Sequence, residues 1–223
     1  MSSSDPPPSA SPSASEAPPA KRARDAEATK KRLLDAAESE FARKGFAGAR
    51  LRDVARDAAV QQALIHHYFV DKGGLYRAVL ERAIAETTRE SWSILGSIAG
   101  VVPMLEAFVE MLVRFYASHA HLLAILRAEA ASGGSIATEL MRDRTKPVFD
   151  AVEAILKDAQ ARGELRSDVA ASEMIVAVLA MTIFPYQEAP LLEALWPNGG
   201  PRDVTVEARK ITIVAIALRG LTR

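Results

Sequence analysis

The chain has 223 residues, 49% of them hydrophobic, and its 28 Lys and Arg residues balance its 28 Asp and Glu residues. This length and hydrophobic content allow a sizeable buried core in one or two domains. The absence of cysteine excludes disulfides, thiolate nucleophiles and cysteine-based metal sites. No uncharged apolar run reaches about 18 residues and residues 1–20 lack a secretory pattern, so we expect a cytoplasmic protein that makes no membrane contact.

Residues 1–24 are rich in Pro, Ser and Ala and offer little apolar surface, which predicts a disordered N-terminal extension. It ends in the basic cluster Lys21-Arg22-Ala23-Arg24. This cluster is either a solvated charge run, which we favour, or an arm that reaches nucleic-acid phosphates. Residues 21–90 carry 15 Lys or Arg residues against 11 Asp or Glu residues, so this part of the chain is mildly basic.

A first helix is predicted from about residue 26 to residue 44. Leu33, Leu34, Ala37 and Phe41 are spaced to form one apolar stripe along it. Gly45 follows Arg43 and Lys44, an arrangement that is typical of a helix end.

Residues 50–69 are predicted to form two short helices joined by a tight turn. Their inward-facing residues, spaced three or four apart, would be Leu51, Val54 and Ala55 in the first helix and Val60, Leu64 and Tyr68 in the second. The periodicity is compatible with a helix-turn-helix, but by itself it favours an ordinary helical hairpin with a polar outer face.

The outward face of the second of these helices favours the helix-turn-helix. Its side chains are short or medium in length and mostly polar but uncharged: Gln61, Gln62, Ala63, His66 and His67. A merely solvated face more often carries Glu and Lys, whereas Gln and His can pair with base edges in a major groove.

A further helix is predicted to begin after residue 71 and to run towards Trp92. Asp71 is placed to cap its N-terminus, and Lys72 lies in its first turn. Backbone N–H groups at a helix start, together with a lysine, form a natural phosphate site. The alternative for Lys72 is an unpaired surface lysine.

Three successive segments share one pattern of residue type and spacing. They are Leu-Leu-Asp-Ala-Ala-Glu-x-x-Phe-x-x-x-Gly-Phe at 33–46, Leu-Arg-Asp-Val-Ala-Arg-Asp-Ala-Ala-Val at 51–60, and His-His-Tyr-Phe-x-x-Lys-x-x-Leu-Tyr at 66–76. Together they resemble the DNA-binding domain of TetR-type transcriptional regulators. The resemblance implies a three-helix DNA-binding domain at 25–87, followed by a larger helical ligand-binding and dimerisation domain at 88–223.

The resemblance also implies roles for individual residues on double-stranded DNA. We expect Gln62, His66 and His67 to contact bases and Ala63 to contact a thymine methyl group. Phosphate contacts are expected from Arg52, Tyr68 and Lys72. Arg50 and Gln61 complete the predicted DNA-binding set.

The sequence departs from the family pattern at three turn positions. Ala49-Arg50 stands where a hydroxyl residue usually caps the second helix, Ala59 replaces a common Gly, and Gln61 replaces a small hydroxyl residue. A lost N-cap costs about 1 kcal/mol and a left-handed Ala about 1–2 kcal/mol, which a fold tolerates. The hydroxyl–phosphate contacts that relatives make at these positions are not expected here.

From about residue 100 onward the pattern is helix after helix, so the predicted fold class is all-α. The expected segments are 102–118, 121–131, 136–162 with a kink or break near Lys146 caused by Pro147, 169–184, 191–196 and 204–218. The segments 169–184 and 204–218 are apolar on more than one face. Such helices are either central in a monomer or shared with a partner. The resemblance implies the second, a homodimer that presents two recognition helices to a pseudo-palindromic operator.

Bulky apolar residues in this half are by themselves more typical of a filled core, but the resemblance implies that they line a pocket for an unknown small-molecule effector that is mostly apolar. The expected lining residues are Phe108, Met111, Phe115, Arg127, Phe149 and Met181. A filled core is the alternative for the same residues.

Motifs for catalysis are missing from the sequence: we find no His-Glu-x-x-His, glycine-rich phosphate loop or nucleophile elbow. We therefore expect no catalytic residues, no metal site and no cofactor. The preferred interpretation is a ligand-responsive transcriptional repressor, and the alternative is a helical ligand-binding protein that has lost specific DNA binding.

Overall fold

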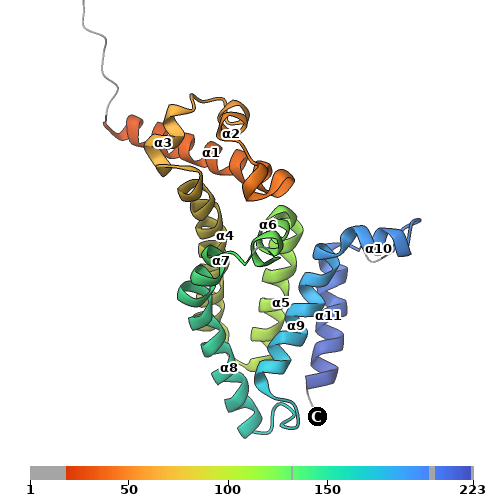
Figure 1. Ribbon diagram of the computed structural model, residues 1–223. Helices are drawn as coiled ribbons and strands as arrows, with labels where there is room; N and C mark the ends of the chain where they lie inside the picture. Colours follow the sequence, from red (N-terminus) through yellow and green to blue (C-terminus); the bar gives the residue numbers. More distant parts are fainter. Residues whose placement is uncertain (1–18, 132, 201–203, 222–223) are drawn as a thin grey trace, which may run out of the picture.

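The computed structural model describes residues 19–131, 133–200 and 204–221, and all regular elements in these ranges are helices (Figure 1). The all-α prediction is therefore confirmed. The helices are α1 Pro19–Gly48, α2 Leu51–Asp57, α3 Ala63–Phe69, α4 Lys72–Ser97, α5 Val101–Ser118, α6 Ala120–Ala131, α7 Ser135–Leu140, the π-helix η1 Met141–Thr145, α8 Lys146–Ala161, α9 Ala171–Gln187, α10 Ala189–Leu195 and α11 Val206–Leu221.

Helices α1, α2 and α3 form the N-terminal unit at the top of Figure 1. Leu33, Phe41, Val54 and Ile65 are each at most 1% exposed and pack together at its centre. The stripe predicted for the first helix is thus confirmed. Gly45 adopts a φ of 67°, which interrupts the helical conformation near the predicted end of that helix.

Helix α4 joins the N-terminal unit to the remaining helices without interruption. It begins beside α3 and runs down along α5, α7 and α8 (Figure 1). The same hydrophobic cluster that fills the N-terminal unit extends to Phe115 of α5 and Ile125 of α6. The boundary proposed at residues 87 and 88 therefore lies within one helix and beside a continuous core.

Several predicted helix ends differ from the structure by two or more residues, and the differences in α1 and α9 have a physical reason. Helix α1 begins at Pro19, so residues 19–24 of the extension predicted to be disordered are helical, while residues 1–18 lie outside the described ranges. Ala, Lys and Arg favour helix, and Pro is well suited to a first helical position. Helix α9 continues through Pro185 to Gln187 instead of ending at residue 184. Tyr186 explains the extension, because it packs on the second hydrophobic cluster and lies 5.4 Å from the Arg209 guanidinium.

The break predicted near Lys146 is confirmed. The five-residue π-helix Met141–Thr145 separates α7 from α8, and Pro147 occupies the first turn of α8. Proline has no amide hydrogen to donate to the preceding turn, and the helix is irregular there, with the Lys146 amide donating to the Met141 carbonyl. Single π turns of this kind occur often at functional sites.

Candidate functional site

The predicted outward face of α3 is exposed. Gln61, Gln62, Ala63, His66 and His67 all lie at the surface. Arg50 and Arg52, at the start of α2, are exposed as well. The N-terminal unit therefore presents polar, mostly uncharged side chains on one short helix, flanked by cations.

The buried face of α3 is rotated by one residue from the prediction. Ile65 and Phe69 are 0% and 6% exposed, whereas Val60, Leu64 and Tyr68 are only partly buried. The prediction was wrong because α3 has only seven residues, too few for spacing alone to define which side faces the core. Tyr68 consequently lies at the edge of the exposed face, 5.0 Å from the His67 ring between centroids.

The ring of His66 is held by the backbone that follows α3. Its Nδ1 atom lies 3.0 Å from the carbonyl oxygen of Val70. A carbonyl can only accept, so this contact places a proton on Nδ1 and leaves Nε2 as the acceptor of the neutral ring. His66 is thereby oriented before any partner arrives.

A strained turn sets the angle between α3 and α4. Val70 has a φ of 68° and a ψ of −57°, and the amide of Asp71 donates to the Phe69 carbonyl at 2.7 Å. This is a γ-turn with positive φ, a rare conformation for a β-branched residue. Asp71 then caps α4 as predicted by accepting from the Gly74 amide at 2.8 Å. A Cβ atom at Gly74 would lie 2.0 Å from the Phe69 carbonyl oxygen, so the turn requires glycine there.

Within the described residues no side chain caps α2 in place of the missing hydroxyl, although a carboxylate binds the backbone at the start of this helix. The amide of Arg50 donates to Glu40 Oε1 at 3.4 Å, and Lys44 Nζ lies 2.7 Å from the same oxygen and 3.0 Å from Asp53 Oδ2. Burial favours protonation of Glu40, but the bonds from Lys44 and Arg50 outweigh it and hold the pKa of Glu40 below its usual value. The hydrogen bond from Lys44 also lowers the pKa of Asp53. Ala59 has a φ of 53°, which confirms the left-handed alanine predicted for this turn.

Lys72 is not the unpaired surface lysine of the alternative interpretation. Its ammonium donates to the Ala47 carbonyl at 3.1 Å and lies 4.9 Å from the centre of the Phe46 ring. An ammonium has three N–H donors, so these contacts position Lys72 while leaving donors for an anion.

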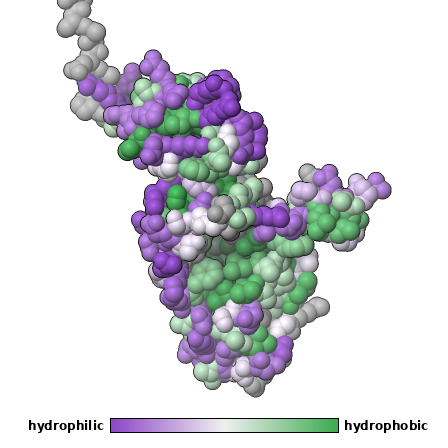
Figure 2. All heavy atoms as spheres, viewed as in Figure 1, coloured by the Kyte–Doolittle hydropathy of each residue, from purple (hydrophilic) through white to green (hydrophobic). Residues whose placement is uncertain are grey.

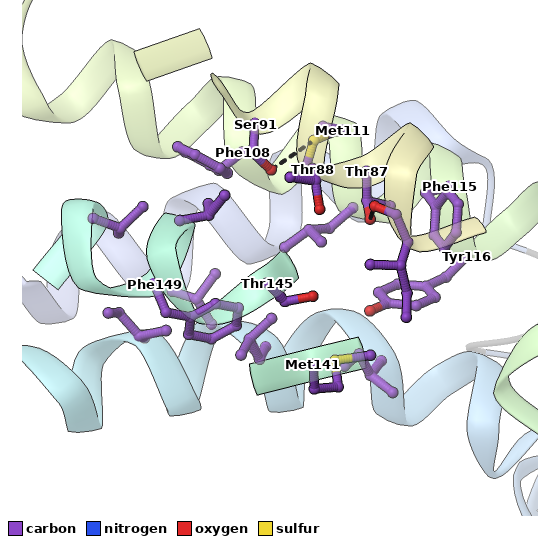
Figure 3. A pocket seen from close by; sticks show the side chains of 18 of the residues that line it. Thr87, Thr88, Ser91, Phe108, Met111, Phe115, Tyr116, Met141, Thr145 and Phe149 are labelled. Atoms are coloured by element: carbon purple, nitrogen blue, oxygen red, sulfur yellow. Dashed lines mark hydrogen bonds between the residues drawn. The ribbon is translucent and has the colours of Figure 1, made fainter. Parts of the chain in front are cut away.

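Below the N-terminal unit, a cavity of about 520 Å³ lies between α4, α5, α6, η1, α8 and α9 (Figure 3). Five residues of the predicted pocket line it: Phe108, Met111, Phe115, Arg127 and Phe149. Met181 does not line it and packs beside the second hydrophobic cluster instead. The prediction for Met181 was wrong because α9 turns Leu179 and Ile183 to the cavity, and Met181 is two residues, about 200°, from each of them.

The polar groups of the cavity were not foreseen. Thr87, Thr88 and Ser91 enter it from α4 and Thr145 from the end of η1 (Figure 3). Thr87 donates to the Ile84 carbonyl at 3.0 Å, and Ser91 contacts the Met111 sulfur at 3.7 Å. Small hydroxyl residues inside helices give no periodic signal, so only the packed structure shows that they face a cavity.

A buried hydrogen bond ties α4 to α6 between the cavity and the N-terminal unit. The Tyr76 hydroxyl donates to Glu129 Oε2 at 2.9 Å, and the residues are 2% and 7% exposed. Burial first, and then the bond to Glu129, raise the pKa of Tyr76 well above its usual value. The other oxygen of Glu129 accepts from the Ile136 amide at 3.2 Å, at the start of α7.

An apolar surface runs along α9, α10 and α11. Its most exposed members are Val176, Phe184, Leu191, Leu195, Ile211 and Ile216, each at least 49% exposed. Figure 2 shows hydrophobic residues gathered over this side of the molecule, in contrast with the hydrophilic N-terminal unit. Within the described ranges, no single helix meets the length and hydropathy needed to cross a bilayer, although α9 and α10 together meet both across a 74° bend.

Comparison with known proteins covers both halves of the chain. Residues 33–79 match the family model described as bacterial regulatory proteins, tetR family, and residues 102–216 match a model described as tetracyclin repressor-like, C-terminal domain.

Named relatives include two repressors. The HTH-type transcriptional repressor SCO4008 of Streptomyces coelicolor is 32% identical over 163 residues, which cover 71% of this chain and 79% of the relative. The HTH-type transcriptional repressor NicS of Pseudomonas putida is 24% identical over 205 residues, which cover 91% of this chain and 96% of the relative.

Solved structures share the fold. The ketosteroid transcriptional regulator KstR2 of Mycobacterium tuberculosis has a TM-score of 0.70 at 20% identity, over 87% of this chain and 95% of that chain. The transcriptional regulator FadR of Bacillus subtilis, solved in complex with stearoyl-CoA, has a TM-score of 0.63 at 14% identity, over 85% of this chain and 98% of that chain.

Proposed function

The chain belongs to the TetR family of bacterial regulatory proteins, and from this premise we propose a DNA-binding transcriptional repressor that an apolar small molecule releases from its operator. The observation that carries the proposal is the exposed face of α3, with Gln62, His66 and His67 directed away from the core. The named relatives that are repressors support the direction of control.

Base recognition would rest on the outward side chains of α3. Gln62 can pair with the two major-groove groups of adenine. In its uncharged form with the proton at Nδ1, the His66 ring offers Nε2 as an acceptor for an amino group of adenine or cytosine. His67 and Ala63 complete the base-reading set, with Ala63 against a thymine methyl group. Gln61 lies at the same exposed end of α3.

Phosphate contacts would position this helix in the groove. Arg50 and Arg52 are exposed at the start of α2, Tyr68 lies at the edge of the exposed face of α3, and Lys72 bonds to the Ala47 carbonyl just before α2. Lys72 stands in the first turn of α4, where backbone amides and the helix dipole also favour an anion.

A homodimer would present two copies of α3 to a pseudo-palindromic operator. We assign the dimer surface to the predicted segments 169–184 and 204–218, whose exposed residues include Val176, Ile211 and Ile216. One short recognition helix seldom binds tightly alone, whereas a two-fold pair matches two half-sites.

The cavity is proposed as the effector site. Its volume lies in the range of small-molecule pockets, and apolar side chains dominate its lining. Release from DNA requires that the effector favour the non-binding conformation by about 3 kcal/mol for a hundredfold loss of operator affinity. Helix α4 is suited to carry this effect, because Thr88 and Ser91 line the cavity and Lys72 begins the same helix.

Selection of bound sequences from a random DNA pool tests the DNA-binding part. We expect a two-fold symmetric sequence to be enriched and its affinity to fall steeply as salt rises, since phosphate contacts release counterions. Gln62→Ala and His66→Ala should each weaken the selected site by about 1–3 kcal/mol and barely change binding to random DNA. Arg52→Ala should weaken both, because an exposed cation contacts phosphate regardless of sequence.

Ser39→Ala serves as the matched control, since Ser39 is an exposed, uncharged residue of the same unit on α1. If no sequence were enriched, or if affinity did not depend on salt, the protein would be the ligand-binding alternative without specific DNA binding. An equal loss on selected and random DNA for Gln62→Ala would show that Gln62 does not read sequence.

A further inference from the structure

Two threonine hydroxyl groups that line the cavity lack a hydrogen-bond partner among the described residues. They are Thr88 Oγ1 and Thr145 Oγ1, and both atoms are buried. Figure 3 shows both pointing into the same cavity, Thr88 from α4 and Thr145 from the end of η1. Leaving a buried hydroxyl unpaired costs more than an average hydrogen bond gains, so such groups require an explanation.

A neighbouring threonine shows that a position inside a helix does not by itself leave the hydroxyl groups of Thr88 and Thr145 without a partner. Thr87 lines the same cavity from the same helix but donates to the carbonyl of Ile84 at 3.0 Å. This is the usual bond of a threonine inside a helix. The hydroxyls of Thr88 and Thr145 do not form this bond to a carbonyl of their own helix, so both are available to a molecule in the cavity.

The charge of the lining restricts what that molecule can be. Among the described residues that line the cavity, only Arg127 is charged, and its guanidinium lies 2.9 Å from Glu188. The side chain of Arg127 is also 59% exposed, which places it at the mouth rather than inside. An ionised group placed beside the two threonines would therefore lose its hydration without gaining a counter-charge.

We propose that Thr88 and Thr145 form a subsite for the carbonyl oxygen of an uncharged, otherwise apolar ligand such as a ketone, ester or lactone. A carbonyl oxygen has two lone pairs and accepts two hydrogen bonds, one from each hydroxyl. The rest of the ligand contacts apolar side chains such as Phe108, Met111 and Phe149. This inference rests on the proposed role of the cavity as the effector site.

The subsite also explains how a ligand acts on DNA binding. Thr145 ends the π-helix, whereas Thr88 belongs to the helix that begins beside α3. A carbonyl bonded to both hydroxyls links these two elements and favours the conformation in which they are correctly spaced.

Matched probes test the subsite. Displacement of the neutral apolar dye N-phenyl-1-naphthylamine would be measured for butyrophenone, for butylbenzene, which lacks the oxygen, and for the anion 4-phenylbutyrate. We expect the ketone to bind more tightly than the hydrocarbon and the anion. Thr88→Val and Thr145→Val, which keep the side-chain volume, should each weaken butyrophenone by about three- to tenfold, as expected for one hydrogen bond, and leave butylbenzene unchanged.

Thr87→Val is the matched control, because the Thr87 hydroxyl is already bonded to its own helix and its loss should leave the ratio of ketone to hydrocarbon affinity unchanged. Melting temperatures of all three variants establish that they fold. Three outcomes would overturn the subsite while leaving the effector role of the cavity intact. They are equal affinity for the ketone and the hydrocarbon, tighter binding of the anion than of the ketone, and an unchanged ketone affinity in both Thr88→Val and Thr145→Val. If no probe displaced the dye from the unmodified protein, the effector role of the cavity would fall and the subsite with it.

Discussion

Replacing Tyr76 by Phe should lower the free energy of unfolding by about 2 kcal/mol, because it removes one buried hydrogen bond to a carboxylate. The bond joins Tyr76 of α4 to Glu129 of α6 at 2.9 Å, and both side chains are less than 10% exposed. Water cannot readily replace the lost hydroxyl, so the buried Glu129 carboxylate would lose this donor without compensation from solvent. For a chain of this size the change corresponds to a melting temperature lower by about 4–8 °C.

Urea unfolding followed by circular dichroism measures this difference, and Tyr116→Phe provides the control. Tyr116 also lies in the interior, but its hydroxyl forms no hydrogen bond with any described residue, so the same deletion should cost less than about 0.5 kcal/mol. A double-mutant cycle with Glu129→Gln should return a coupling of about 1–2 kcal/mol. The reasoning would be refuted if Tyr76→Phe lowered the free energy of unfolding no more than Tyr116→Phe does. A coupling energy near zero would likewise show that the Tyr76–Glu129 bond does not stabilise the protein.

Three further predictions concern the N-terminal unit. Val70→Gly should raise the melting temperature, because glycine relieves about 1 kcal/mol of backbone strain at φ 68°. Val70 is 78% exposed, so removing its side chain sacrifices little packing. An equal rise in melting temperature for Val70→Ala would show that strain is not the cause. Ala59→Gly should stabilise the protein by up to about 1 kcal/mol for the same reason at φ 53°, and a lower melting temperature would contradict this. The pKa values of Glu40 and Asp53 are lowered in the folded state, so their contribution to stability is present above about pH 4.5 and lost as the pH falls through the folded values. Asp53→Asn should therefore reduce stability near about pH 7 and flatten its decline between about pH 5 and pH 3 in urea titrations, and an unchanged decline would exclude Asp53 as a contributor.

Features that depend on short-range geometry could be predicted from the sequence. The apolar stripe of α1, the left-handed Ala59, the Asp71 cap and the break before Pro147 all follow from the spacing and conformational limits of a few neighbouring residues. The family resemblance, applied to the bulky apolar residues of the C-terminal half, indicated a cavity that Phe108 and four of the other predicted residues line.

Which sides of these helices meet depends on packing between distant segments, so it could not be predicted from the sequence. Rotation of a helix by one residue changes its buried face by about 100°, which is why Ile65 rather than Leu64 is buried and why Met181 misses the cavity. The Tyr76–Glu129 bond joins residues 53 positions apart, a pairing that no local pattern encodes. The unpaired state of Thr88 and Thr145 is likewise a property of packing, because a hydroxyl lacks a partner only once every surrounding element is in place.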